Sequence, residues 1–359
     1  MSEAVQAAPR EQGWARLLLA LAAFLFLPAI PVFGATLPVT DSFVLLVPAF
    51  AACTLVGWWA GGRAALAIVW VPLAAFSLFM RMDASGSYGV LLRAWAVVLA
   101  GAFGLLALLD VRRSFFPRAL TALAMALVAG LTISTALRSP VGRVQRIVTQ
   151  QMEKRNAGTI AQLRALSHEE PDIWATVTAQ YANGQAPIDD VEDALGSVTR
   201  KTAPVFLSLL ALQSLAALAL AWALYHRLGR ARLGPPLASL GDFRFNDQLV
   251  WGLIAGLVIL LLPSLSPSRS GGFRALRTPG LNLIVFFLSL YALRGFGVLS
   301  WMLSSRTLAI VVAVTLVLVL VPMTAGIALP GLLSLVTAAG VLGLGDTWFD
   351  WRRRARLTP

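Results

Sequence analysis

The chain has 359 residues, of which 58% are hydrophobic and only 13% are charged, and its mean hydropathy is +0.77. Soluble domains carry about 25% charged residues, so this composition excludes both an ordinary soluble enzyme and a disordered protein. It indicates an all-α, polytopic integral membrane helix bundle, in which a formal net charge of +12 has to be explained by topology or by nucleic-acid binding.

Apolar stretches long enough to cross a bilayer recur along the whole chain. A hydrocarbon core about 30 Å thick needs about 20 apolar residues in a helix, and about ten stretches approach that length. Pro28 and Pro31 predict a kink or an early end in the first stretch. The predicted spans are 14–33, 43–60, 64–80, 90–109, 115–137, 203–225, 249–265, 280–303, 308–321 and 327–344. They form two membrane domains, residues 1–137 and 203–359.

The arginines predict the orientation of these spans. Ten spans place both termini on one side of the membrane, and with cytoplasmic termini the inside segments hold 15 arginines and the short outside loops hold 5. Because cytoplasmic loops are enriched in Lys and Arg, we expect cytoplasmic N- and C-termini. The dominance of arginine over lysine is typical of a GC-rich bacterial genome, so the predicted location is a bacterial inner membrane. Anionic lipid at the cytoplasmic face is then the expected partner of the basic loops, and nucleic acid is not.

A polar segment, residues 138–202, separates the two membrane domains and is extracytoplasmic in this topology. It contains 8 basic and 8 acidic residues, so it is electrically balanced. Its apolar residues recur at approximate helical spacing, which predicts amphipathic helices. These residues are Val144, Val148, Met152, Ile160, Leu163 and Leu166. We interpret the segment as a solvated helical cap, with a lid or a partner-docking surface as the alternative.

Motifs for catalysis and for metal or nucleotide binding are absent from the sequence. It contains no G-x-x-x-x-G-K-[ST], no H-E-x-x-H and no C-x-x-C. The two histidines, His168 and His226, have no second metal ligand nearby in the sequence. We therefore expect no enzymatic activity, no catalytic residue, no cofactor and no metal site.

The clearest candidate for a functional site is Arg294, which lies near the centre of the predicted span 280–303. A charged residue at the bilayer centre costs roughly 2.5–3.5 kcal/mol and by default marks a functional site. Gly295 and Gly297 follow it, and such a Gly-x-Gly pair either weakens the helix or lets another backbone approach closely. A break in the helix here would allow the cation to hold an anionic substrate group. With Asn282 of the same span, these residues form the predicted substrate-binding site. The alternative is a structural ion pair between Arg294 and an acidic residue.

Three stretches of the second half resemble the YybS-like family of uncharacterised bacterial multi-pass membrane proteins. They are DFRFNDQLVWGL at the start of the seventh span, LYALRGFGVLSWML in the eighth, and LGLGDTWFDWRRR at the end of the chain. The resemblance covers roughly residues 200–356 and implies no catalytic residues, because the family has no established activity. A more distant similarity connects the chain to the substrate-binding subunits of energy-coupling-factor transporters. The chain departs from that type by its larger number of spans and its polar insertion.

These observations predict a small-molecule binding or transport component. Because the sequence lacks an ATPase motif, such a component needs an energising protein partner or an ion gradient. The alternative is a non-catalytic adaptor or assembly protein of the cell envelope that acts through the extracytoplasmic insertion.

Overall fold

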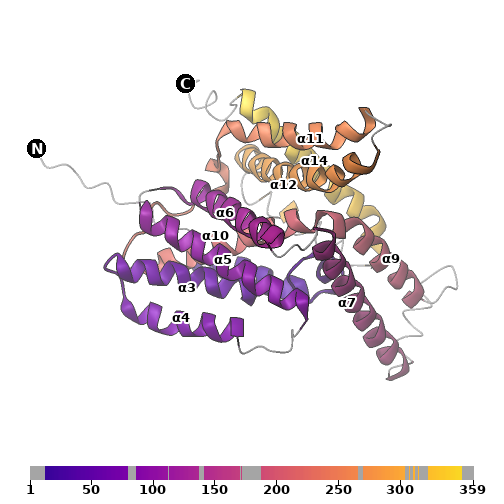
Figure 1. Cartoon of the computed structure of the whole chain (residues 1–359), viewed down its shortest axis with the longest axis horizontal. Helices are drawn as coiled ribbons and strands as arrows, with labels where there is room; N and C mark the ends of the chain where they lie inside the picture. Colours follow the sequence, from indigo (N-terminus) through magenta and orange to yellow (C-terminus); the bar gives the residue numbers. More distant parts are fainter. Residues whose placement is uncertain are drawn as a thin grey trace, which may run out of the picture. The chain divides into compact units, whose positions relative to one another are not determined.

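The computed structural model describes residues 13–79, 86–111, 113–136, 141–169, 171, 187–265, 270–303, 307, 310–311, 314 and 322–349. Every regular element within these ranges is a helix, and the described residues form no strand. The all-α fold class predicted from composition is confirmed (Figure 1). The chain divides into two compact units, Met1–Leu237 and Ala238–Pro359.

Four helices in the described part of the chain are long and apolar enough to cross a membrane. They are Ser87–Leu109, Phe115–Ile133, Val191–Leu228 and Leu276–Met302. Shorter apolar helices accompany them at Trp14–Ala29, Phe43–Trp59, Ala64–Phe79 and Asp247–Leu262. Large apolar side chains point away from the protein on several of these helices, for example Trp59, which is 81% exposed, and Leu109, which is 74% exposed. Outward apolar surface of this extent is compatible with a membrane protein. Ten spans are not confirmed, and the span predicted at 308–321 lies largely outside the described residues.

Unit 1 contains helices from the first predicted membrane domain, from the insertion and from the first predicted span of the second membrane domain. Its elements are α1 (Trp14–Phe26), η1 (Leu27–Ala29), α2 (Pro31–Thr36), α3 (Phe43–Trp59), α4 (Ala64–Phe79), α5 (Ser87–Leu109), α6 (Phe115–Ala136), α7 (Val141–Glu169), α9 (Pro187–Thr202), η2 (Ala203–Val205) and α10 (Phe206–Leu228). The expected early end of the first helix is confirmed, because Pro28 lies in a 3-10 turn and Pro31 starts a separate short helix. Helix α3 is the most enclosed element, since α4, α5 and α10 all pack against it.

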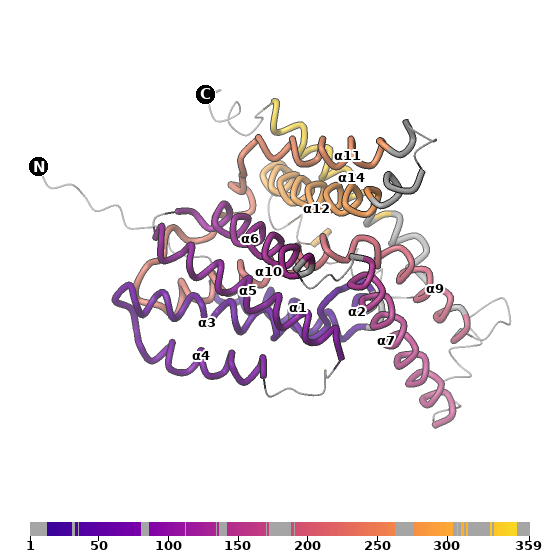
Figure 2. The backbone as a smooth tube through the Cα atoms, viewed as in Figure 1, coloured from indigo at the N-terminus to yellow at the C-terminus, as the bar shows by residue number. Residues whose placement is uncertain are grey.

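The described residues of the insertion form the helices α7 and α9, as predicted, and part of α7 belongs to the core of unit 1. Val148 and Met152 of α7 are 1% and 2% exposed and join a cluster that includes Leu92 and Phe206. Farther along α7, Ile160 packs with Ile188 and Leu195 of α9. Figure 2 shows α7 and α9 lying side by side. Only Leu166 departs from the predicted apolar face, because it is 52% exposed.

Unit 2 is organised around one long helix. Its elements are η3 (Leu240–Asp242), η4 (Asp247–Leu249), α11 (Val250–Leu265), α12 (Ser270–Met302) and α14 (Pro322–Phe349). Helices α11 and α14 both pack against α12. The predicted break at Gly295 and Gly297 is wrong, because α12 continues without interruption to Met302. Helix α12 also begins ten residues before the predicted span, which places Arg294 eight residues from its C-terminal end.

Candidate functional site

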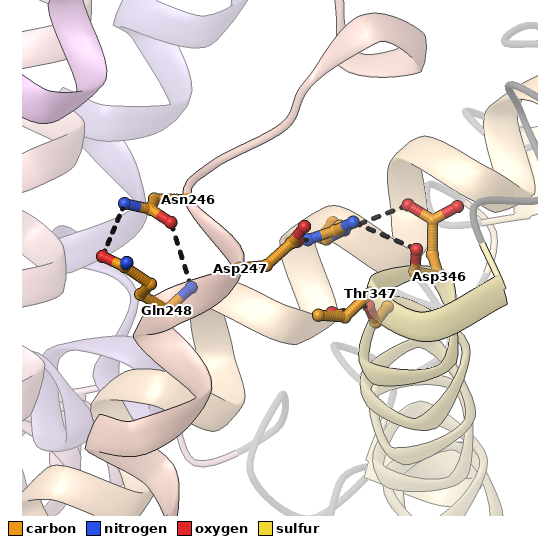
Figure 3. Close-up of polar contacts among 7 residues, drawn as sticks. Asn246, Asp247, Gln248, Asp346 and Thr347 are labelled. Carbon is orange, nitrogen blue, oxygen red and sulfur yellow. Dashed lines mark hydrogen bonds and ion pairs between the residues drawn. The ribbon is translucent and has the colours of Figure 1, made fainter.

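Arg294 is buried and forms ion pairs with Asp247 and Asp346, both in unit 2 (Figure 3). We call these three residues the Arg294 cluster. Arg294 Nε donates to Asp346 Oδ2 at 3.0 Å, and its Nη1 donates to Asp247 Oδ1 at 2.6 Å. The guanidinium also lies over the Phe245 ring, 5.4 Å from the ring centroid. The Arg294 side chain is only 3% exposed, so its ion pairs replace the hydration that a charged group has in water.

The elements that carry these residues explain why they meet. Arg294 lies on α12 and Asp346 in the last turn of α14, while Asp247 is the first residue of η4, directly before α11. Asn246 accepts a hydrogen bond from the Gln248 backbone N–H at 3.0 Å and fixes this start (Figure 3). The cluster therefore forms where α11 begins and α14 ends, along one side of α12.

Two glycines bring α12 and α14 into backbone contact beside the cluster. A Cβ atom at Gly295 would overlap the carbonyl of Ala339, and a Cβ atom at Gly343 would overlap the carbonyl of Tyr291. Only glycine permits this approach, because every other residue carries a Cβ. Gly295, which we predicted as part of a substrate site, here lets α14 come close enough for Asp346 to reach Arg294.

The electrostatics of the Arg294 cluster favour cohesion between helices. Arg294 Nη2 donates to the backbone carbonyl of Asp346 at 3.1 Å, which is one of the last four carbonyls of α14. A cation at a helix C-terminus also interacts favourably with the helix dipole. One arginine with two carboxylates leaves a net negative charge, so the arrangement disfavours an added anion.

The other two predicted site residues lie apart from these ion pairs. The carbonyl of Gly297 accepts a hydrogen bond from Ser300 Oγ at 2.9 Å, within α12. Asn282 donates to the carbonyl of Thr278, one turn earlier in the same helix, at 2.8 Å. Asn282 is twelve residues from Arg294, which corresponds to about 18 Å along a helix. The structure thus places Arg294 and Gly295 at the contact with α14 and places Asn282 elsewhere on α12.

A cavity in unit 1 is a second candidate site, which sequence reasoning missed. It has a volume of about 680 Å³, which lies within the roughly 300–1,000 Å³ typical of small-molecule sites. Leu25 near the end of α1, Ser77 near the end of α4, and the starts of α3 and α5 line it. The cavity therefore lies at one end of this helix bundle, and α7 contributes Gln151 and Arg155 to its wall.

The segment before α3 forms part of the cavity wall and is held by side chains of three helices. Gln213 of α10 accepts a hydrogen bond from the backbone N–H of Val39 and donates to its carbonyl, at 3.0 and 2.6 Å. Arg155 of α7 donates to the carbonyls of Gly34 and Leu37 at 2.6 and 3.1 Å, and Tyr88 of α5 donates to the carbonyl of Pro38. This wall is fixed by buried hydrogen bonds rather than by regular structure.

Polar and apolar groups share the cavity lining. Its charged side chains in the described part of the chain are Asp41, Arg93 and Arg155. Ser42 also lines the cavity; it is 1% exposed, and the described residues offer its Oγ no hydrogen-bond partner. A buried hydroxyl without a partner costs free energy, and this oxygen is covered by the surrounding protein atoms.

Comparison with known proteins identifies no relative of the chain. No family model matches it, and no curated protein or solved structure is significantly similar. The three sequence stretches that suggest the YybS-like family contribute Asp247, Arg294 and Asp346, so they meet in the Arg294 cluster. The functional assignment therefore depends on the geometry of the two candidate sites.

Proposed function

We propose that the chain is a multi-pass membrane protein of the bacterial inner membrane that binds a small molecule in the unit 1 cavity, as a binding or transport component. The observation that carries this proposal is the cavity itself, which combines a suitable volume with apolar and charged side chains at one end of an apolar helix bundle. Without an ATPase motif in the sequence, movement of the ligand requires a partner protein or an ion gradient.

The distribution of arginine in unit 1 supports an extracytoplasmic opening of the cavity. Arg63 lies between α3 and α4, Arg113 between α5 and α6, and Arg230 after α10. These connections are at the same end of the unit, because the carbonyl of Leu233 accepts from Arg118 at the start of α6 and Gly62, between α3 and α4, lies against Ala231 after α10. The cavity lies at the opposite end, where α3 and α5 begin. Under the positive-inside rule the basic end is cytoplasmic.

We assign the Arg294 cluster to the cohesion of unit 2 rather than to the ligand. Its donors are engaged by Asp346 and Asp247, and its net negative charge opposes the anionic group that a lone arginine would attract. The ligand site of this proposal is therefore the unit 1 cavity.

A cavity-filling experiment tests the proposed function. We expect the wild-type protein, purified in a neutral maltoside detergent, to carry a small molecule that organic extraction and mass spectrometry detect. Ser77→Trp and Thr40→Trp place an indole in the cavity lining and should strongly reduce the extracted amount. Ser87→Trp is the matched control, because Ser87 is exposed at the start of α5 and does not line the cavity.

The comparison requires that each variant elutes as a monodisperse species with a cooperative thermal transition. If both filled variants retain the same compounds in wild-type amounts, the cavity is not the binding site and the proposal fails.

The adaptor alternative predicts a different response. Deleting residues 141–200 does not separate the two functions, because it also removes Val148, Met152 and Arg155 from the core and the cavity wall. A charge at Leu166, the exposed apolar residue of α7, is more selective. Leu166→Glu should leave the extracted small molecule unchanged, whereas loss of a protein partner with retention of the ligand would favour the adaptor role.

A further inference from the structure

We propose that His226 and the segment that follows α10, residues 229–236, form a pH-sensitive latch. The latch is held when the imidazole carries two protons and is released at Gly234 when it loses one. We call this segment the strap; it is the last part of unit 1 before Leu237. The inference does not depend on the cavity, which lies at the opposite end of the unit.

The strap is held to unit 1 through its backbone carbonyls. Three side chains of α6 and α10 donate hydrogen bonds to these carbonyls, from Tyr225 to Ala231 at 2.9 Å, from Arg118 to Leu233 at 3.0 Å and from Trp222 to Pro235 at 3.2 Å. The strap turns at Gly234, where φ is +122°, and a Cβ atom there would lie 2.9 and 3.0 Å from two carbonyl oxygens of the connection before α6. Glycine permits this close approach because it has no Cβ.

Both ring nitrogens of His226 face backbone carbonyl oxygens. Nδ1 lies 3.0 Å from the oxygen of Trp222, and Nε2 lies 3.1 Å from the oxygen of Gly234. A neutral imidazole has one N–H donor, so it can serve only one of these acceptors and turns a nitrogen lone pair toward the other. The imidazolium donates to both. The two acceptors therefore select the charged form of His226, and loss of a proton breaks one of the two hydrogen bonds.

The difference between the two acceptors explains why release occurs at Gly234. The Trp222 carbonyl lies one turn earlier in the helix that carries His226, so it cannot move away from the ring. Gly234 lies in a connection outside the helices. When Nδ1 keeps the remaining proton, the lone pair of Nε2 faces the Gly234 oxygen, and the strap relieves this repulsion by moving away.

Two further features stabilise the second proton on His226. The imidazole lies 4.5 Å from the Trp222 ring, centroid to centroid, and the face of an indole attracts a cation. His226 is also in the last turn of α10, where the helix dipole favours a positive charge. The residue is only partly buried, so its protons exchange with water.

Neighbouring cations oppose the second proton, Arg118 among them. Its guanidinium lies 4.8 Å from the centroid of the Trp222 ring, but it donates to the carbonyls of Leu233, Asp110 and Arg113, which distributes its charge over three dipoles. The other ionisable groups on the described elements at this end of unit 1 are Tyr225 and Arg227 on α10, Cys53 on α3, Arg16 on α1, Arg63 before α4, Asp110 and Arg113 before α6, and Arg230 and Arg232 in the strap. Most of these arginines are exposed, so solvent and salt screen their repulsion.

The direction of the pH response follows from the proton that the latch requires. Because histidine changes its charge between about pH 5 and pH 8, the latch is held at the acidic end of this range and released as the pH rises. In the orientation that we propose, the strap is on the cytoplasmic side, so the latch responds to the pH of that compartment. Unit 2 begins at Ala238, so release loosens the chain that leads into it.

Histidine-selective ¹⁵N NMR of the full-length protein in a neutral maltoside detergent tests the protonation state. The chain contains two histidines, so His168→Gln leaves His226 as the single reporter. We expect both ring nitrogens to carry a proton at about pH 5 and only one of them at about pH 8. A ring that carries a single proton at the lower pH would overturn the proposal, because the strap would then be held without the second donor.

Thiol labelling measures the opening of the strap. Leu233 is 0% exposed, so in a Cys53→Ala background the thiol of Leu233→Cys reacts with a maleimide only when the strap opens. Arg230→Cys is the matched control, because Arg230 is exposed in the same strap and corrects for the pH dependence of the thiol reaction. We expect the ratio of the two rates to rise about tenfold between about pH 5 and pH 8, as one hydrogen bond to a charged group is lost.

Two histidine variants connect this opening to His226. His226→Gln has no ionisable ring and should give the same ratio at both pH values, whereas His168→Gln should keep the full response. A ratio that does not change with pH in the parent protein, or that changes equally in His226→Gln, would show that His226 is not the latch. If His226→Gln does not fold, the NMR spectrum and the response of the parent still decide. None of these measurements uses a ligand, so their failure would leave the proposed function standing.

Discussion

Arg294 holds two aspartates that differ sharply in their exposure to solvent. The Asp346 side chain is 0% exposed and that of Asp247 is 61% exposed, although both accept hydrogen bonds from the same guanidinium. An exposed ion pair contributes at most about 1 kcal/mol, whereas removal of one partner of a buried pair costs about 3–5 kcal/mol, because a charge remains buried without compensation. The two ion pairs therefore make unequal contributions to stability.

This inequality gives an order of effects. Arg294→Ala leaves the buried Asp346 carboxylate without its cation and should destabilise unit 2 by about 3–5 kcal/mol. Asp247→Asn should cost no more than about 1 kcal/mol, since water reaches its side chain. Thermal unfolding of the purified variants in detergent measures both. Equal losses for the two variants would contradict the assignment of Asp346 as the principal partner.

Among the elements, the contact between α12 and α14 depends on residues that have no side chain. Gly295 and Gly343 each face a backbone carbonyl of the other helix, Ala339 and Tyr291 respectively. This close approach resembles the packing of membrane helices at small residues, where backbones come together and van der Waals contact replaces the hydrophobic effect. It also determines the distance between Arg294 and Asp346.

Substitution of these glycines should separate the helices. Gly295→Leu places a side chain where the Ala339 carbonyl lies and should destabilise unit 2 by about 3 kcal/mol or more. Gly331→Leu on α14 is the control, because a Cβ at Gly331 meets no atom within 4 Å. The melting temperatures of the two variants provide the test, and tolerance of Gly295→Leu would show that the close contact is not needed.

For the molecule as a whole, the orientation in the membrane connects sequence to function. The basic connections and the cavity lie at opposite ends of unit 1, so the orientation that we propose would place the arginines in the cytoplasm and the cavity outside. Thr40 lines the cavity and is exposed, and Arg230 is exposed at the basic end. A label at each of these two positions therefore reports which side of the membrane the cavity end and the basic end face.

Thiol labelling tests this orientation. The chain has a single cysteine, Cys53, which is buried, so a Cys53→Ala background accepts single cysteines without interference. In intact spheroplasts, Thr40→Cys should react with a membrane-impermeant maleimide, and Arg230→Cys should react only after the membrane is permeabilised. The reverse labelling pattern would contradict an extracytoplasmic cavity.

Hydropathy predicted the helices of unit 1 closely, because their ends coincide with prolines, glycines and charged residues. The stretch 43–60 corresponds to α3 (Phe43–Trp59), and 115–137 corresponds to α6 (Phe115–Ala136). The start of α12 was missed, since residues 270–279 are polar and include Pro279 and yet are helical. A prediction from the length of apolar stretches cannot detect a helix that extends beyond its apolar part.

The candidate sites were less accessible to sequence reasoning than the helices. Arg294 was found because a charge in an apolar stretch is conspicuous, but its partners are 47 and 52 residues away along the chain, and no spacing rule connects them. The cavity gave no signal, since its lining comes from α1, α3, α4, α5 and α7 and depends on packing between them. Ser42 could be recognised as an N-cap, but only the structure leaves its hydroxyl without a partner among the described residues.

The hydrogen bonds that hold the segment before α3 have a consequence for biosynthesis. The carbonyl of Gly34 is hydrogen-bonded to Arg155, 121 residues later in the chain, and the backbone N–H of Val39 is hydrogen-bonded to Gln213, 174 residues later. While the chain is being made, α1 and α3 are complete long before these side chains leave the ribosome, and contacts of such long range form late in folding. The cavity wall is therefore assembled only after α10 has been synthesised, and a nascent chain that stops earlier has its first helices but lacks the hydrogen bonds that hold this wall.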